Sequence, residues 1–240
     1  TGQPKYIPIL SATLDHLRRS QKIFSYVQYK DCKEAFFGRI VGMVSPAIDG
    51  TLANGIPFGS ASGHIYKTMP KAAKAKYLLP EEVFTIEDYG LKYEVIARLC
   101  FEADDITYLG SANPSSFHRL LEVVNKYRYD MIDDIKSGVF RRIDELPENI
   151  AEAVKLRLSP NPERAIILND LLMSGNLIRY SDFWPCLKLV ATWTGGSCGV
   201  SLSGILDSFP SDVRISELGY LSSEFRGTIT IDAETNAGVP

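Results

Sequence analysis

The pattern of apolar and polar positions predicts strands and helices that alternate along most of the chain. An apolar run at 187–193 and an extended run at 213–218 are predicted to be strands, with a short helical pattern between them. Apolar runs at 38–44 and 106–109 also have the length of buried strands. This alternation favours an α/β fold with a mixed, largely parallel sheet flanked by helices.

Longer segments carry apolar residues at helical spacing. The apolar positions 14, 17, 24 and 27 predict a helix that Ser11 caps and that ends near Cys32. Further helices are predicted at 86–103, 115–136, 148–158 and 162–173. The segment between 45 and 69 is rich in Gly, Ser and Pro and is predicted to be a long loop, a feature that is usually functional or poorly ordered.

Composition and charge narrow the class of protein. The chain has 240 residues, enough for one large domain or two small ones. Its formal net charge is −3 with both signs interspersed, which argues against nucleic acid as the main partner. No apolar run approaches the ~20 residues of a membrane span, and no signal peptide is present. We therefore expect a cytoplasmic protein without a membrane or nucleic-acid partner.

The four cysteines, Cys32, Cys100, Cys186 and Cys198, are scattered along the chain. None of them forms a Cys-x-x-Cys pair, so neither a zinc site nor a disulfide scaffold is indicated. They are predicted to be buried thiols in a reducing compartment.

Two loops rich in Gly, Ser and Thr follow the predicted strands at 187–193 and 213–218. If these strands are parallel neighbours, both loops open at the edge where α/β sheets bind ligands. Gly195 and Gly196 have no Cβ, so a flat ligand can approach their backbone closely. Ser222 and Ser223 can donate hydrogen bonds to phosphate oxygens. The alternative is an ordinary strand–turn–helix unit with polar turns.

Three other residues near these loops or the N-terminus have chemistry suited to a nucleotide. Glu224 is a hard oxygen ligand of the kind that holds Mg²⁺ beside substrate phosphates. Tyr220 can stack on a base, and Lys5 ends a Gly-containing turn that can fold over phosphates. The alternative for Lys5 is a surface lysine without a ligand.

A second interpretation starts from Gly195-Gly-Ser197-Cys-Gly199, which fits the Gly-x-Ser-x-Gly nucleophile elbow of serine hydrolases. In that class the catalytic histidine follows the serine in the chain. Here all three histidines, at positions 16, 64 and 118, precede Ser197. The hydrolase interpretation therefore loses its main support, and we expect no histidine within hydrogen-bond reach of Ser197.

Four segments, taken together and in order, resemble one known family. Thr1–Lys5 followed by Tyr-Ile-Pro is similar to the end of a Ser-Ser-Gly-Thr-Thr-Gly-x-x-Lys phosphate loop, and 55–63 is similar to a second loop of that family. Trp193–Ser197 resembles its glycine loop, and Tyr220–Glu224 resembles its Tyr-Ala/Gly-Ser-Ser-Glu motif. The family is the auxin-responsive (Gretchen Hagen) acyl acid–amido synthetases of the adenylate-forming superfamily, and its bacterial members above all.

The resemblance implies a two-step ligase that uses ATP and Mg²⁺. It would activate a small-molecule carboxylic acid as an acyl-adenylate and then join it to the amine of an amino acid. Lys5 and Glu224 would be catalytic, with Glu224 as the metal ligand. The nucleotide would be bound by Thr1, Gly2, Thr194, Gly195, Gly196, Ser197, Tyr220, Ser222 and Ser223.

The chain also departs from the family pattern. The first half of the phosphate loop, the third motif (Tyr-Arg-x-Gly-Asp) and the small C-terminal domain are not in the sequence, and Leu221 replaces a small residue. We therefore expect residues 1–240 to be part of the large N-terminal acyl-adenylating domain, inactive alone, with an acyl pocket near 111–121. The alternative from another class is a non-catalytic module that binds a nucleotide or an acid.

Overall fold

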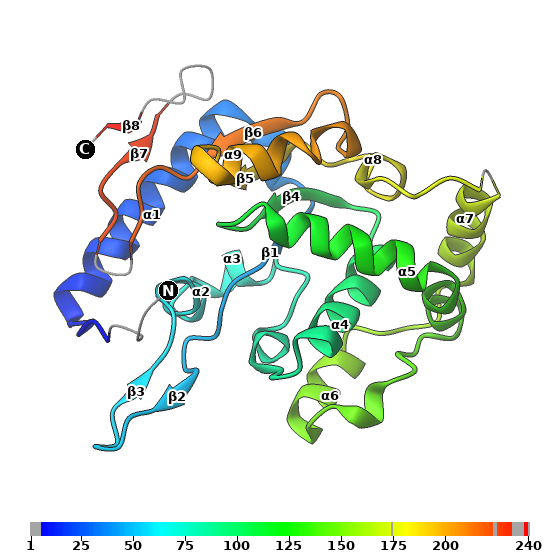
Figure 1. Ribbon diagram of the computed structural model, residues 1–240, viewed down its shortest axis with the longest axis horizontal. Helices are drawn as coiled ribbons and strands as arrows, with labels where there is room; N and C mark the ends of the chain where they lie inside the picture. Colours follow the sequence, from blue (N-terminus) through cyan, green and yellow to red (C-terminus); the bar gives the residue numbers. More distant parts are fainter. Residues whose placement is uncertain (1–5, 174, 223–224, 232–237, 240) are drawn as a thin grey trace.

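The computed structural model describes residues 6–173, 175–222, 225–231 and 238–239. Within them, helices and strands alternate as the apolar pattern predicts (Figure 1). The strands are β1 (Arg39–Gly42), β2 (Gly50–Thr51), β3 (Pro57–Phe58), β4 (Ile106–Gly110), β5 (Leu189–Thr192), β6 (Arg214–Glu217), β7 (Ile229–Thr230) and β8 (Gly238–Val239). The α-helices are α1 (Ser11–Asp31), α2 (Ala61–Lys67), α3 (Lys71–Lys74), α4 (Tyr89–Glu102), α5 (Ser115–Ser137), α6 (Glu148–Lys155), α7 (Pro162–Leu172), α8 (Tyr180–Phe183) and α9 (Gly196–Ser203).

A four-stranded parallel sheet organises the fold. Its strand order is β1-β4-β5-β6, and each neighbouring pair is parallel. All four residues of β5 are buried, as expected for a parallel strand covered on both faces. The prediction that the runs at 187–193 and 213–218 form neighbouring parallel strands is confirmed, and so is the α/β fold class.

The two faces of the sheet are covered differently. Val41, Leu109 and Val190 face the main hydrophobic core, which α4 and α5 fill. Leu189 and Tyr108 belong to a smaller cluster with the short 3-10 helix Lys33–Phe36 that follows α1. In Figure 1 the sheet accordingly lies between α1 on one side and the α4–α5 pair on the other.

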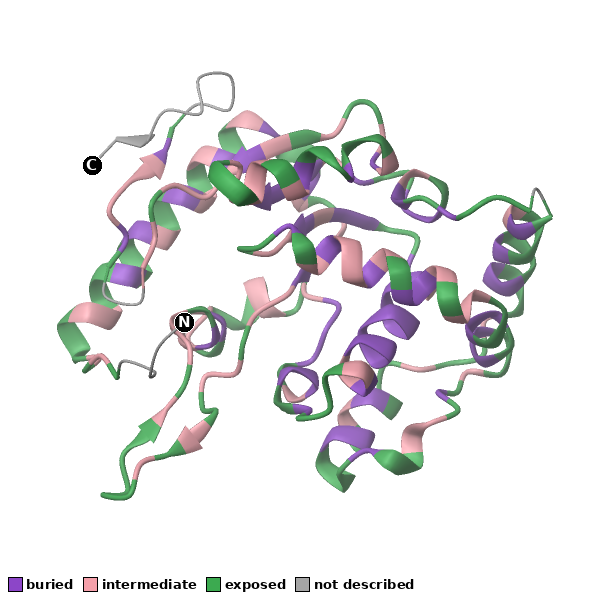
Figure 2. Cartoon of the chain, in the orientation of Figure 1, coloured by how far each residue is buried: buried purple, intermediate pink, exposed green. Residues whose placement is uncertain are grey.

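Local signals set the ends of the long helices. Asp88 caps α4, because its carboxylate accepts a hydrogen bond from Leu91 N at 2.7 Å. Gly138 ends α5 in the left-handed conformation with φ 71°, where a Cβ would lie 2.3 Å from Pro160 N. The long helices also differ in what they bury: Figure 2 shows α4 buried along most of its surface, whereas α1 buries only one stripe.

Two predictions about local structure are wrong. The segment 45–69 is not a bare loop, because it holds the β2–β3 hairpin and α2. Ser60 caps α2, and Gly63 lets this helix pack against the 45–47 backbone, where a Cβ would lie 2.3 Å from Ala47 N. Ser11 is the first residue of α1 rather than its cap, which is Leu10.

The cysteine prediction is half right. Cys32 and Cys100 are buried, but Cys186 is exposed and Cys198 is half-buried. The sequence around a cysteine does not show whether another segment will pack over it. All four are free thiols. Among the described helices, none is both long and apolar enough to cross a membrane.

Candidate functional site

The carboxyl ends of the four parallel strands bring their loops together at one edge of the sheet. Backbone hydrogen bonds continue beyond the strands: Ser111 N donates to Ala191 O at 3.1 Å, and Leu218 N donates to Thr192 O at 3.2 Å. The loops after β4, β5 and β6 therefore start side by side. This places the Gly-rich loop after β5 next to the loop that begins the Tyr220 motif, as the sequence predicts.

The carboxylate of Glu217, at the end of β6, ties these two loops together. Its Oε2 accepts hydrogen bonds from the backbone N and from Oγ1 of Thr194, both at 2.5 Å, and its Oε1 accepts one from Gly219 N at 3.0 Å. Trp193 Nε1 adds a bond of 3.0 Å to Gly219 O. The sequence analysis did not predict this role for Glu217, because the residue lay inside a predicted strand. The signal that could have indicated it is an acidic residue at the end of the strand, immediately before the loop.

Glycine conformations shape both loops. Gly219 has φ +77°, and a Cβ there would lie 2.6 Å from Thr228 O, so only glycine fits this turn. Gly196 opens α9 with φ +55°, and a Cβ on Gly195 or Gly196 would meet nothing within 4 Å. The space in front of this glycine pair is therefore open. The first N–H groups of α9 point along the helix axis without intrahelical acceptors.

A cavity of about 470 Å³ lies beside these loops, at the carboxyl edge of the sheet. Its lining comes from the ends of all four strands and from α1, α2 and α4. The volume is in the range of small-molecule sites. Ser111, Ala112, Asn113 and Ser116 line it, so part of the segment nominated for the acyl pocket does border a cavity.

The cavity is largely apolar but contains two cationic side chains. Phe24, Met43 and Ile96 are among its apolar residues, and Arg226 and Lys92 are its cations. Burial lowers the pKa of Arg226 and of Lys92 below their ordinary values. A guanidinium nevertheless stays charged at neutral pH. Arg226 was not predicted from the sequence, since nothing local marks it as buried.

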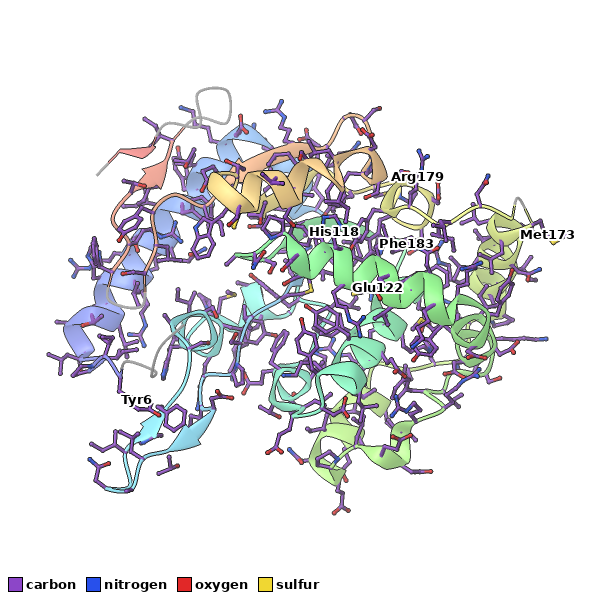
Figure 3. The ribbon with its side chains drawn as sticks, viewed as in Figure 1. Tyr6, His118, Glu122, Met173, Arg179 and Phe183 are labelled. Atoms are coloured by element: carbon purple, nitrogen blue, oxygen red, sulfur yellow. The ribbon has the colours of Figure 1, made fainter. Side chains whose placement is uncertain are left out.

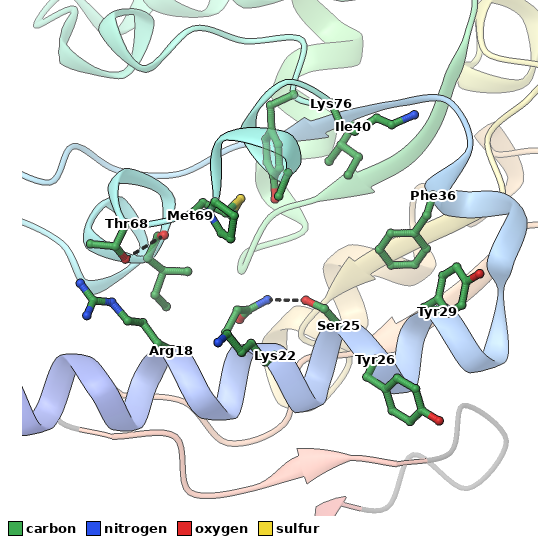
Figure 4. Close-up of a pocket in the computed structure, with 15 residues that line it drawn as sticks. Arg18, Lys22, Ser25, Tyr26, Tyr29, Phe36, Ile40, Thr68, Met69 and Lys76 are labelled. Carbon is green, nitrogen blue, oxygen red and sulfur yellow. Dashed lines mark hydrogen bonds between the residues drawn. The ribbon is translucent and has the colours of Figure 1, made fainter.

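A second hollow, of about 720 Å³, lies between α1 and the α2–α3 segment (Figure 4). Gln21, Ile65, Met69 and Tyr77 line both hollows, so the two adjoin. In Figure 4, Tyr29 extends from α1 toward Phe36, with the two ring centroids 5.8 Å apart. Of the predicted nucleotide-binding residues that the structure describes, none lines this second hollow.

The predicted site residues fall into two groups. Thr1, Gly2, Lys5, Ser223 and Glu224 lie outside the described residues. Thr194, Gly195, Gly196 and Ser197 follow β5, while Tyr220 and Ser222 follow β6.

None of the described members of this set lines the cavity. Tyr220 is 63% exposed, and Ser222 N donates to Phe225 O at 3.0 Å in a tight turn. Leu218 and Leu221, from the same loop, line the cavity, whereas Gly195–Ser197 do not. The roles proposed for these residues toward a ligand stay predictions.

The histidine nearest to α9 is engaged elsewhere. Figure 3 labels His118 on α5, and its Nε2 lies 2.6 Å from Ser201 O on α9. Within the described part of the chain, no hydrogen bond joins a histidine to Ser197. The same residues contain no group of three or more His, Cys, Asp or Glu side chains that could hold a metal ion.

Comparisons with known proteins match this fold. The family model described as the GH3 family N-terminal domain matches residues 1–212. Among solved structures, the GH3.15 acyl acid amido synthetase superposes with a TM-score of 0.79 at 17% sequence identity, covering 95% of this chain and 41% of its own. The AtGH3.15 acyl acid amido synthetase in complex with 2,4-DB superposes with a TM-score of 0.78 at 17% identity, covering 96% and 40%.

The chain thus spans about two fifths of the solved structures it matches. No curated protein matches it. At 17% identity the structural likeness shows the fold, and the family model, which covers most of the chain, shows the family. The chain belongs to the GH3 family, within the family's N-terminal domain.

Proposed function

We propose that this chain is the core of the large, acyl-adenylating domain of an ATP-dependent acid–amino acid ligase. The observation that carries the proposal is the cavity at the carboxyl edge of the sheet, which Leu218 and Leu221 line from the loop that resembles the Tyr-Ala/Gly-Ser-Ser-Glu motif. A carboxylic acid held in that cavity would lie next to a nucleotide held by the loops. The solved relatives named as acyl acid amido synthetases, one of them in complex with 2,4-DB, support this assignment.

In the first step, a carboxylate oxygen would attack the α-phosphorus of ATP. The bond from that phosphorus to the β-phosphate oxygen would break, giving acyl-adenylate and pyrophosphate. Such a step depends on positioning and on neutralising the phosphate charge. Lys5 and the backbone N–H groups of Gly195–Ser197 would supply the charge and the donors, and Tyr220 would stack on the adenine.

In the second step, the amine nitrogen of an amino acid would attack the acyl carbon. The bond to AMP would break and the nitrogen would lose a proton, leaving an amide. This step calls for a site closed to water, because water would otherwise hydrolyse the adenylate. We propose that closure depends on parts of the protein outside residues 1–240, so the chain alone forms no amide.

The chemistry that Mg²⁺ would supply when bound is neutralisation of part of the negative charge on the ATP phosphates. Two carboxylates belong to the end of β6 and the loop that follows it, those of Glu217 and Glu224. Glu217 already accepts hydrogen bonds from Thr194 and Gly219, so it has little capacity left for a cation. Glu224 is therefore the residue we assign to the metal.

Pyrophosphate exchange tests the proposal, because labelled pyrophosphate enters ATP only when adenylate formation runs backward. With the whole protein and a panel of aromatic and aliphatic acids, we expect exchange that depends on the acid. We expect Glu224→Gln to lower the exchange rate far more than it lowers nucleotide affinity. Glu122→Gln, which alters an exposed ion pair on α5, serves as the matched control.

Two results would contradict parts of this proposal. Exchange at full rate by residues 1–240 alone would show that the site is complete within the chain. An unchanged rate in the Glu224→Gln variant would show that the metal site lies elsewhere. Nucleotide binding without exchange by the whole protein, for every acid tested, would favour the non-catalytic binding module instead.

A further inference from the structure

The described residues include three buried arginines, Arg98, Arg164 and Arg226. Burying a guanidinium is costly unless its donors find partners, and an unpaired buried charge is the costliest case. Each of the three must therefore be accounted for by what surrounds it.

Arg98 and Arg164 are accounted for by the protein itself. Arg98 donates to the Glu102 carboxylate at 2.6 Å and to two backbone carbonyl oxygens. Arg164 donates to three backbone carbonyl oxygens, including Phe183 O at 2.8 Å. Neither lines the cavity at the sheet edge. Both are structural, since they cross-link backbone segments inside the fold.

Arg226 differs from Arg98 and Arg164 in its position at the cavity and in how few of its donors are paired. Its side chain is 7% exposed and lines the cavity. Its Nη2 donates to Gln21 Oε1 at 3.1 Å, and its Nη1 makes a long bond of 3.4 Å to Leu218 O. Its guanidinium carbon also lies 4.6 Å from the ring centroid of Phe24. A guanidinium has five N–H donors, and most of those on Arg226 have no hydrogen-bond acceptor among the described residues.

No carboxylate pairs with Arg226 among the described residues. The two neutral oxygens and the aromatic ring hold the guanidinium in place without cancelling its charge. An anion that entered the cavity would meet this charge away from bulk water, where charge-assisted bonds are strong. The arrangement is that of a receptor for an oxyanion.

The surroundings distinguish a carboxylate from a phosphate. Gly195–Ser197, the loop predicted to approach the nucleotide, does not line the cavity, whereas Phe24, Ile65, Met69 and Ile96 do. The anion is therefore expected to carry an apolar body rather than a sugar and base. We propose that Arg226 binds the carboxylate of the acid substrate and orients it, while the apolar wall holds a small aromatic or aliphatic body. This inference rests on the proposed function, of which it names the substrate-binding residue.

Direct binding in the absence of ATP tests the inference. Benzoate, phenylacetate and hexanoate, together with the three matching amides, are titrated into the whole protein by calorimetry. Replacing Arg226 by Gln removes charge-assisted hydrogen bonds, so we expect the Kd of the acids to rise by about 10- to 100-fold. The amides carry no charge, and their affinity is expected to stay the same. Arg226→Lys keeps the charge without the planar fork and should give an intermediate Kd.

Two further variants serve as controls. Arg214→Gln removes an exposed arginine on β6 that pairs with Asp31 outside the cavity, and it should leave acid binding unchanged. Lys92→Gln removes the other cation of the cavity lining. If Lys92→Gln abolishes acid binding and Arg226→Gln does not, the proposal is overturned. If Arg226→Gln does not fold, as judged by circular dichroism, Arg226→Lys decides the matter.

The kinetic readout separates this inference from the proposed function. In pyrophosphate exchange, Arg226→Lys should raise the KM for the acid and leave the KM for ATP unchanged. A rise confined to the KM for ATP would mean that Arg226 binds phosphate, and the inference would fail while the ligase function stood. Arg226-dependent acid binding by a protein without exchange would uphold the inference and refute the ligase. A purely structural role would raise the Kd of acids and amides alike, which would also overturn it.

Discussion

The Glu217 carboxylate is the interaction that joins the two loops of the candidate site, so its removal is the most informative single change. Glu217→Gln keeps the shape of the side chain and removes its charge. One amide oxygen can still accept from Thr194, but the amide NH₂ cannot accept from Gly219 N. We therefore expect one hydrogen bond to be lost and those to Thr194 to be weakened.

The size of the effect follows from the number and type of these bonds. A hydrogen bond to a charged group contributes about 1.5–3 kcal/mol when buried, and less where water screens it. Glu217 is half-buried, so we expect a loss of about 1–2 kcal/mol in the free energy of unfolding. These hydrogen bonds hold only the two loops together, so we expect the loss to appear as more frequent local opening of these loops. A loss of about 1.4 kcal/mol corresponds to a tenfold change in that opening equilibrium.

Two measurements check this expectation. Urea unfolding gives the global change, and hydrogen exchange at the amides of Thr194 and Gly219 gives the local one. We expect exchange at both amides to be roughly tenfold faster in the variant. Glu122→Gln, at an exposed ion pair on α5, should change the free energy of unfolding by less than about 0.5 kcal/mol. Unchanged protection at both amides in a folded Glu217→Gln protein would refute the role assigned to this carboxylate.

Three further predictions concern strain, packing and pH. Gly219→Ala should lower the free energy of unfolding by about 2–4 kcal/mol, because it adds a clash with a backbone oxygen to an unfavourable φ. Gly55 has φ +84° and open space around it, so Gly55→Ala should lower the free energy of unfolding by only about 1 kcal/mol in the same urea titration. Trp184→Ala removes a fully buried ring and should cost about 3–5 kcal/mol; a loss below about 2 kcal/mol would show that the site collapses around the cavity. Burial raises the pKa of the Tyr66, Tyr93 and Tyr108 phenols to about 12, from an ordinary value of 10. Their contribution to the free energy of unfolding is therefore complete below pH 10 and is lost between pH 10 and 12, by up to about 1.4 kcal/mol per pH unit for each phenol. Urea midpoints that stay constant from pH 9 to pH 11 would contradict this.

Local patterns were sufficient for the framework of the fold. The apolar run before Gly195 became a strand that is buried at all four positions, because burial on two faces requires a continuous apolar stretch. The extended run before Gly219 became the last strand in the order of the sheet and is buried at one position. The helix predicted at 115–136 followed from its apolar spacing, and α5 ends at Ser137, just before Gly138. The parallel order of strands and helices then placed two loops at one edge. Each of these inferences uses residues within one element or its ends.

The segment between 45 and 69 shows where local patterns were insufficient. Its Gly, Ser and Pro residues suggested a loop, yet Gly63 is needed because α2 packs against the backbone at 45–47. A glycine selected for close packing and a glycine selected for a turn are identical in the sequence. The tertiary neighbour decides which of them is present.

The same limit applies to the two residues that most shape the candidate site. Glu217 and Arg226 are ordinary charged residues near a loop when the sequence is considered alone. Arg226 meets Gln21 across a sequence separation of 205 positions, and Glu217 meets Thr194 across 23. Periodicity and turn signals extend over a few residues, so the sequence by itself determined the class of fold and the edge of the sheet where a ligand would bind. Only the tertiary structure decided which charges are buried there and which partners they meet, because desolvation and pairing depend on segments that are brought together only when the chain folds.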